Sequence, residues 1–92
     1  MAEHRRALTI VNSRGLHARA SAKFVNAASQ LPDGVCVTVS KGANSAAGGS
    51  ILGLMMLGAA RGDTIELVVT GDADGTVIEQ LSALVADGFG EE

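Results

Sequence analysis

The chain has 92 residues, of which 47% are hydrophobic and 18% are charged, and its mean hydropathy is +0.28. This composition excludes a disordered tail, and the length excludes two independently folded units, so we expect a single domain over residues 1–92. The net charge of −3 argues against nucleic acid as a partner, because binding to a phosphate backbone needs a cluster of Lys and Arg side chains.

Two strands and one helix are predicted in the first half of the chain. Residues 6–12 are rich in β-branched side chains and end in a turn-forming NSRG cluster, which is typical of a strand. From Leu16 onward, apolar residues recur at steps of three and four, which indicates a helix that must end before Pro32. Residues 35–40 alternate valine with smaller or polar groups, so they should form a strand with one face toward the core.

The second half contributes two helices and one clear strand. Residues 43–49 have weak propensity for any structure and are predicted as either a short edge strand or a loop. Ser50 is a suitable N-cap for a helix over residues 51–57. Residues 64–70 alternate as a half-buried strand does, and the apolar residues of segment 77–87 follow the helical period.

The predicted order of elements is therefore β-α-β-(β)-α-β-α. Such an order favours an α+β fold in which the helices lie on one face of a mainly antiparallel sheet. Asp72 and Asp74 lie in the turn before the last helix, where we expect them to cap it.

The distribution of charge indicates where an anion-binding site would lie, and the single cysteine indicates the cellular compartment. Residues 1–45 hold six basic and two acidic residues, whereas residues 46–92 hold one basic and eight acidic residues, so an anion-binding site is expected in the first half. The single cysteine, Cys36, has no disulfide partner within the chain, which favours a reducing compartment. The longest apolar run, residues 51–60, is about half the length of a membrane span. We expect a cytoplasmic protein without a membrane segment.

A candidate phosphate site lies at the predicted junction between the first strand and the first helix. The segment GLHAR, residues 15–19, places unpaired backbone N–H groups and the positive end of the helix dipole beside two polar side chains. Arg19 can hold phosphoryl oxygens with its two-pronged guanidinium group. His17 can either donate to a phosphate or act as the nucleophile that becomes phosphorylated. The alternative is that His17 is only a capping or surface histidine; His4 is expected to be solvated.

Three segments together resemble the histidine-containing phosphocarrier (HPr) family of the bacterial phosphotransferase system. They are GLHAR at residues 15–19, SILGLMM at residues 50–56 and GFGE at residues 88–91. The resemblance covers nearly the whole chain. It implies an open-faced β-α-β-β-α-β-α sandwich with a four-stranded antiparallel sheet and three helices on one face.

The resemblance also implies roles for three residues. His17 would accept a phosphoryl group, as a pros-phosphohistidine, from enzyme I that phosphoenolpyruvate has charged, and would pass it to a downstream acceptor domain. Arg19 would contact the phosphoryl oxygens. Ser50 matches the serine that an ATP-dependent HPr kinase/phosphorylase modifies in many members. The chain would then be a stoichiometric carrier rather than an enzyme, monomeric and without a cofactor.

The resemblance further implies a docking patch for partner proteins around His17. Its members would be Ala20, Phe24, Ile51, Leu52 and Met55. The alternative for these apolar residues is the plain core, and for Phe24 we favour the core.

This sequence departs from the family pattern in three ways. Ala20 follows the arginine where the family has proline, and Gly49 stands where a lysine often precedes the serine. The spacing from His17 to Ser50 is also about two residues longer than usual, and we assign the extra length to residues 42–49.

Two other function classes are compatible with a small α/β chain. One is a regulator of the nitrogen-related branch, whose phosphorylation state would control partners by binding rather than by sugar uptake. The other is a metal- or RNA-binding module, which two histidines, one cysteine and the absence of surface aromatic residues disfavour. We therefore predict no metal site.

Overall fold

The computed structural model describes residues 3–91, which form seven helices and strands followed by a short 3₁₀ turn. In chain order these elements are β1 (Glu3–Thr9), α1 (Ala18–Ala28), β2 (Cys36–Lys41), β3 (Asn44–Ala47), α2 (Ile51–Met56), β4 (Thr64–Thr70), α3 (Thr76–Ala86) and η1 (Gly88–Gly90).

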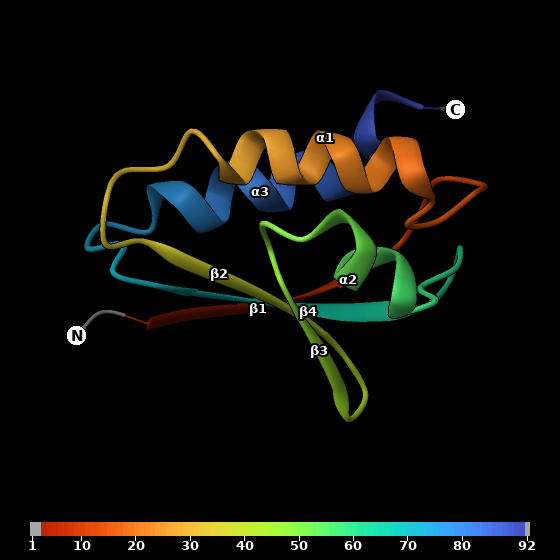
Figure 1. Ribbon diagram of the computed structural model, residues 1–92, viewed down its shortest axis with the longest axis horizontal. Coiled ribbons are helices and arrows are strands. Elements are labelled where there is room, and N and C mark those ends of the chain that lie inside the picture. The colour runs from red at the N-terminus through yellow and green to blue at the C-terminus, as the bar shows by residue number, and fades with distance from the viewer. Residues whose placement is uncertain (1–2, 92) are drawn as a thin grey trace.

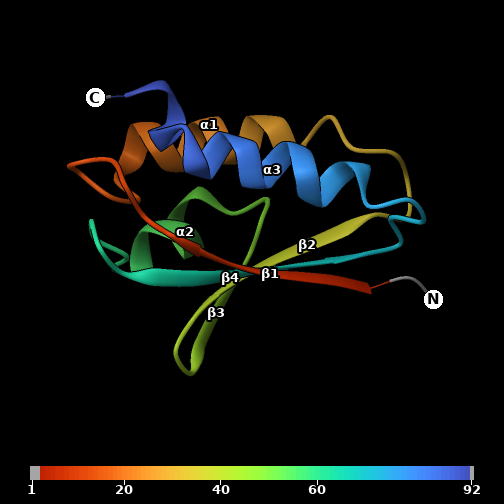
Figure 2. The same cartoon turned by 180° about the vertical axis from the view of Figure 1, so that it is seen from behind.

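The four strands form one antiparallel sheet in the order β1-β4-β2-β3. Figure 1 shows α1, α2 and α3 on one side of this sheet, and the view from behind in Figure 2 shows the same two layers. The other face of the sheet carries no helix among the described residues. The predicted α+β open-faced sandwich is confirmed.

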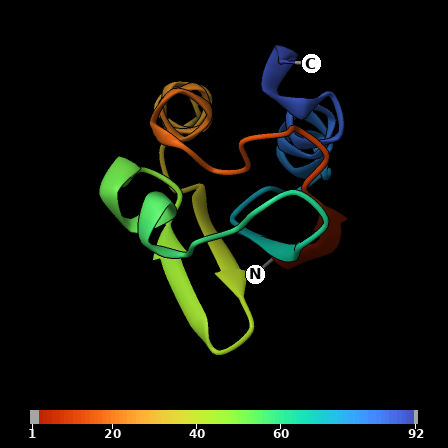
Figure 3. The same ribbon diagram turned by 90° about the vertical axis from the view of Figure 1, so that its right-hand side faces the viewer.

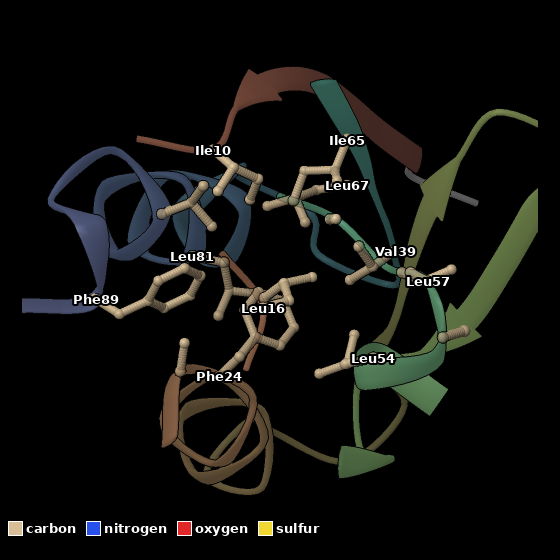
Figure 4. Packing of buried hydrophobic residues seen from close by; sticks show 14 of the residues in the cluster. Ile10, Leu16, Phe24, Val39, Leu54, Leu57, Ile65, Leu67, Leu81 and Phe89 are labelled. Atoms are coloured by element: carbon tan, nitrogen blue, oxygen red, sulfur yellow. The ribbon is translucent and has the colours of Figure 1, made fainter. Parts of the chain in front are cut away.

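The core lies between the sheet and the helices. The inner positions of β4, which are Ile65, Leu67 and Val69, are at most 2% exposed, as strict alternation along a half-buried strand requires. Phe24 of α1 packs against this layer, and Figure 4 shows its ring among buried side chains from several elements. The labelled members of this cluster are Ile10, Leu16, Phe24, Val39, Leu54, Leu57, Ile65, Leu67, Leu81 and Phe89.

Strand β1 begins and ends about three residues earlier than its sequence pattern predicts. It pairs with β4 over its whole length, from Glu3 opposite Thr70 to Thr9 opposite Thr64, so its partner decides its bounds. This pairing includes His4, which we expected to be solvated. That expectation was wrong: His4 is partly buried, and its Nε2 atom lies 2.7 Å from the backbone oxygen of Asp72.

The uncertain segment before α2 forms a strand. Gly42 and Ala43 make the turn between β2 and β3, and Gly42 has a left-handed φ of +59°, which glycine adopts without strain. The ladder then runs from Lys41 opposite Asn44 to Thr38 opposite Ala47. Pairing with β2 therefore supplies the stabilisation that the local sequence lacks.

Asp72 and Asp74 accept hydrogen bonds from the first turn of α3, as predicted, although the N-cap residue itself is Gly75. The Asp72 side chain is almost fully buried and accepts hydrogen bonds from the backbone N–H groups of Val77 and Ile78, at 2.9 and 3.4 Å. Asp74 accepts the N–H of Thr76 at 3.1 Å. These bonds satisfy donors of the first helical turn, which have no partner within the helix.

No helix within residues 3–91 has both the length and the apolar character needed to cross a membrane.

Candidate functional site

His17 is the N-cap residue of α1. Its backbone is extended (φ −75°, ψ −179°), and its carbonyl oxygen accepts the N–H of Ser21 as the first bond of the helix. The ring turns back over the helix end, so that Nδ1 accepts the backbone N–H of Arg19 at 3.3 Å. The imidazole thus lies at the positive end of the helix dipole, where negative charge is stabilised.

The loop that carries His17 is held against the segment after α2. The N–H of Leu16 donates to the carbonyl oxygen of Ala59 at 2.9 Å, and the Leu16 side chain enters the core. Gly15 has a φ of +63°, and a Cβ atom there would lie 2.2 Å from the Ala59 oxygen. Only glycine therefore fits the turn that delivers His17 to the start of α1.

The other ring nitrogen of His17 contacts a carboxylate from the end of the chain. Nε2 lies 2.7 Å from Oε2 and 3.0 Å from Oε1 of Glu91. The fully buried Asn12 side chain donates to the same carboxylate, with Nδ2 3.0 Å from Oε1. These hydrogen bonds, from His17 first and then from Asn12, hold the pKa of Glu91 below its ordinary value of 4.5.

The last turn of the chain brings Glu91 to this place. Figure 1 shows the C-terminal segment beside the first turn of α1. Phe89 is 1% exposed, and its φ of +59° is in the left-handed region, between Gly88 and Gly90, which also have positive φ. Lys23 donates from Nζ to the Phe89 carbonyl oxygen at 2.7 Å. The segment is therefore fixed by a buried ring and by a hydrogen bond to α1.

Positive side chains lie beside Glu91, the partner of His17. Arg14 and Arg19 are exposed, and neither makes an ion pair within residues 3–91. They line an open hollow of about 500 Å³ together with Ser13, Lys23, Gly90 and Glu91. This arrangement agrees with the expectation of an anion-binding site in the basic half of the chain, and it can receive a phosphoryl group.

Ser50 caps α2, as its position in the sequence predicted. Its backbone is extended (φ −112°, ψ 107°), and its Oγ accepts the N–H of Gly53 at 2.9 Å. The side chain is half-buried.

The apolar residues proposed for docking divide into two groups. Ile51, Leu52 and Met55 lie on the outer side of α2, and Leu52 is 68% exposed. Ala20 and Phe24 are 0% and 1% exposed, so neither belongs to a docking patch: the assignment of Ala20 was wrong, and the core position favoured for Phe24 is confirmed. Both lie on the stripe of α1 that the helical period turns toward the sheet, where packing leaves no surface for a partner.

Two exposed apolar residues were missed by the sequence analysis. Met56 is 76% exposed, at the end of α2, and Val11 is 46% exposed in the loop after β1. Figure 3 shows this loop and α2 at the same end of the molecule as the start of α1. Exposure of Met56 could not be told from the sequence, because a short helix of apolar residues has no polar face to mark its orientation.

Glu91 and Asn12 are the other contacts that sequence reasoning missed. The signal that could have indicated Glu91 is the GFG segment before it, since glycines on both sides of a phenylalanine permit a tight reversal. Within residues 3–91, no cluster of three or more His, Cys, Asp or Glu side chains could hold a metal ion.

Comparison with known proteins places this site within a family. The family model described as "PTS HPr component phosphorylation site" matches residues 4–87. The phosphocarrier protein HPr of Neisseria meningitidis serogroup A is 44% identical over 87 residues, which cover 95% of this chain and 96% of the relative. The phosphocarrier protein NPr of Shewanella violacea is 36% identical over 91 residues, which cover 99% of this chain and 98% of the relative.

A solved structure shows the same fold. The crystal structure of HPr-C-His from Thermoanaerobacter tengcongensis superposes with a TM-score of 0.87 at 35% identity, over 97% of this chain and 98% of that chain.

Proposed function

The chain belongs to the HPr family of the phosphotransferase system, whose members are stoichiometric phosphocarriers, and on this premise we propose that His17 carries the phosphoryl group. The donor is enzyme I charged by phosphoenolpyruvate, and the acceptor is a downstream domain of the same system. The observation that carries the proposal is the position of the His17 ring, whose Nδ1 atom lies 3.3 Å from the Arg19 backbone nitrogen at the start of α1. We also propose that this transfer takes place in the cytoplasm.

Transfer needs only one bond to form and one to break. The lone pair on Nδ1 of neutral His17 releases the Arg19 N–H and attacks the phosphorus atom. The bond between phosphorus and the donor atom breaks, with its electron pair returning to the donor. The product is a pros-phosphohistidine. Its phosphoryl oxygens lie beside the N-terminal N–H groups of α1, which stabilise them, and the reverse reaction delivers the group to the next acceptor.

Arg19 is proposed to contact the phosphoryl oxygens. Its guanidinium group lines the hollow beside Glu91 and makes no ion pair within residues 3–91, so its donors are open to an incoming anion.

Docking is proposed to involve the outer side of α2, through Ile51, Leu52 and Met55, whose exposure supports contact with enzyme I and the acceptor. Ser50, at the start of the same helix, is proposed as a regulatory phosphorylation site for an ATP-dependent HPr kinase/phosphorylase. A phosphate there would stand next to the apolar patch and would have to lose its water when a partner closes over it.

A regulatory role of the nitrogen-branch type is the second candidate; the chain is 36% identical to the phosphocarrier protein NPr of Shewanella violacea, which is below its 44% identity to the Neisseria HPr. The two candidates differ in the acceptor. Phosphorylated protein should transfer to an acceptor domain of a sugar-uptake permease in the first case and to a nitrogen-branch acceptor in the second.

Labelling with radioactive phosphoenolpyruvate and enzyme I tests the proposal. Wild type and His4→Ala should take up label in an acid-labile, alkali-stable linkage, whereas His17→Ala should take up none. The His4 variant is the matched control, because it removes the other histidine of the chain. Label persisting in His17→Ala would refute the assignment.

A further inference from the structure

The contact between Glu91 and His17 sets the protonation of the imidazole ring. A carboxylate can only accept hydrogen bonds, so Nε2, at 2.7 and 3.0 Å from its two oxygens, must carry the proton. In the neutral ring the other nitrogen is then an acceptor. The backbone N–H of Arg19, which can only donate, points to Nδ1 and requires the same tautomer.

We propose that Glu91 is a positioning residue for phosphoryl transfer: it holds the proton of His17 on Nε2, so that the lone pair of Nδ1 faces the first turn of α1. This inference rests on the proposed function and adds a residue to it.

The orientation of the Glu91 carboxylate is fixed by a second donor. Asn12 is fully buried, and its Nδ2 donates both to the carbonyl oxygen of Gly15, at 2.8 Å, and to Oε1 of Glu91, at 3.0 Å. Since both partners of Nδ2 are acceptors, the amide cannot turn over without placing its oxygen against them. The side-chain atom of residue 91 that faces Asn12 Nδ2 must therefore be a hydrogen-bond acceptor.

The chain holds Glu91 there before any partner binds. The buried Phe89 ring and the hydrogen bond from Lys23 to the Phe89 carbonyl oxygen fix the backbone just before Glu91. The side chains of His17 and Glu91 are 22% and 17% exposed, so water competes only weakly for their hydrogen bond.

The same contact assists the step itself. When Nδ1 forms its bond to phosphorus, the Nε2 proton stays on the ring, and the ring becomes positively charged. The carboxylate of Glu91 faces this charge at 2.7 Å and stabilises it while the phosphoryl group is carried. No proton has to enter or leave the site during transfer.

Two substitutions at residue 91 separate this role from simple charge or packing. In Glu91→Gln, the side-chain oxygen must stay at the Oε1 position, which faces Asn12, so the NH₂ group replaces Oε2, the nearer of the two oxygens to Nε2 of His17, and opposes the native proton there. Nε2 then keeps a single acceptor, the oxygen at 3.0 Å that it shares with Asn12. The ring should shift toward the tautomer with its proton on Nδ1, which cannot attack. Glu91→Ala removes the acceptor without adding a donor. We expect Glu91→Gln to slow transfer from enzyme I by about tenfold or more, as a wrong tautomer does elsewhere, and Glu91→Ala to slow it less.

The tautomer can be read directly from the ¹⁵N chemical shifts of the His17 ring nitrogens, in unphosphorylated protein at a pH where the ring is neutral. In wild type, Nε2 should be protonated and Nδ1 unprotonated. In Glu91→Gln, the population with a protonated Nδ1 should rise. Glu79→Gln is the matched control, since it removes a carboxylate paired with Arg6 instead. It should leave both the shifts and the transfer rate as in wild type.

Three results would overturn the inference: a tautomer unchanged in Glu91→Gln, transfer by Glu91→Gln at the wild-type rate, or transfer by Glu91→Ala as slow as by Glu91→Gln or slower. The last would show that only the charge or the anchoring of the tail matters. The ¹⁵N measurement needs no phosphoryl transfer, so a failure of the proposed function, seen as absence of label on wild type, is distinguishable from a failure of this inference.

Discussion

At the scale of single residues, the proposed site consists of one side chain, His17, that would accept the phosphoryl group, and of neighbouring side chains that would position its proton and bind the phosphoryl oxygens. His17 was predicted from its sequence, because GLHAR places it locally at a helix start. Asn12 and Glu91 were not, since the contact between His17 and Glu91 joins residues 74 positions apart and depends on the reversal at Phe89. The assignment of Ala20 to the docking patch failed because the helical period identifies an apolar stripe but does not show how closely the sheet covers it, whereas the core assignment favoured for Phe24 is confirmed.

Arg19→Ala should slow phosphoryl transfer without changing stability. The guanidinium group is exposed and makes no ion pair within residues 3–91, so its loss removes contacts with the phosphoryl oxygens only. A hydrogen bond to a charged group contributes about 1.5–3 kcal/mol, which corresponds to a rate about tenfold lower or more. The decrease is measured as the rate of phosphoryl transfer from enzyme I to Arg19→Ala. Arg61→Ala is the control for loss of an exposed arginine. Equal rates in Arg19→Ala and wild type would remove Arg19 from the site.

At the scale of elements, local capping was predictable and strand bounds were not. Ser50 and the two aspartates before α3 act on N–H groups a few residues away, so their roles could be inferred from sequence. Strand β3 could not be decided, because its stabilisation comes from pairing with β2 rather than from its own residues. The bounds of strand β1 differ from the predicted ones for the same reason, since its pairing with β4 determines where it begins and ends.

Substitutions at Ser50 separate capping of α2 from regulation. Ser50→Ala loses the hydrogen bond from Gly53 and should lower the free energy of unfolding by about 1 kcal/mol, with transfer preserved. Ser50→Asn and Ser50→Asp both retain a capping oxygen and should keep the thermal midpoint close to that of wild type. Only Ser50→Asp should slow transfer from enzyme I, because it alone puts a negative charge beside the exposed Ile51 and Leu52.

Chemical denaturation and transfer kinetics on the three Ser50 variants give both quantities. The neutral Ser50→Asn protein is the control for side-chain shape. If Ser50→Asp and Ser50→Asn transfer equally fast, charge at this position has no regulatory effect and the cap is its role.

At the scale of the whole molecule, carboxylates couple stability to pH. Within residues 3–91, four carboxyl groups have a pKa below the ordinary value, each mainly through a hydrogen bond that it accepts. These are Asp63 (from the Ala60 backbone), Asp74 (from the Thr76 side chain), Glu79 (from Arg6) and Glu91 (from His17). A lowered folded-state pKa means that the stabilisation is complete above the unfolded value, 3.8 for Asp and 4.5 for Glu, and is lost as the pH falls through the folded value.

The thermal midpoint should therefore fall as the pH decreases from about 4.5 to about 3. In Glu79→Gln the decrease over this range should be smaller, because one of the linked groups has been removed. Calorimetry at a series of pH values measures both proteins. A midpoint that is constant or rises over this interval would contradict the linkage.

We propose that the chain unfolds as one domain, because one core cluster contains residues from the sheet and from all three helices. In the same calorimetric series, the calorimetric and van't Hoff enthalpies should then agree.

The measurement that tests the central claim most directly is the nitrogen–phosphorus coupling in the phosphorylated protein. The ¹⁵N-labelled chain is charged with phosphoenolpyruvate and enzyme I, and a long-range ¹H–¹⁵N correlation spectrum is recorded for its histidine rings. We predict that Nδ1 of His17 shows one-bond coupling to ³¹P, while Nε2 of His17 keeps its proton and both nitrogens of His4 are unchanged. Coupling at Nε2 of His17, or at either nitrogen of His4, would contradict the account.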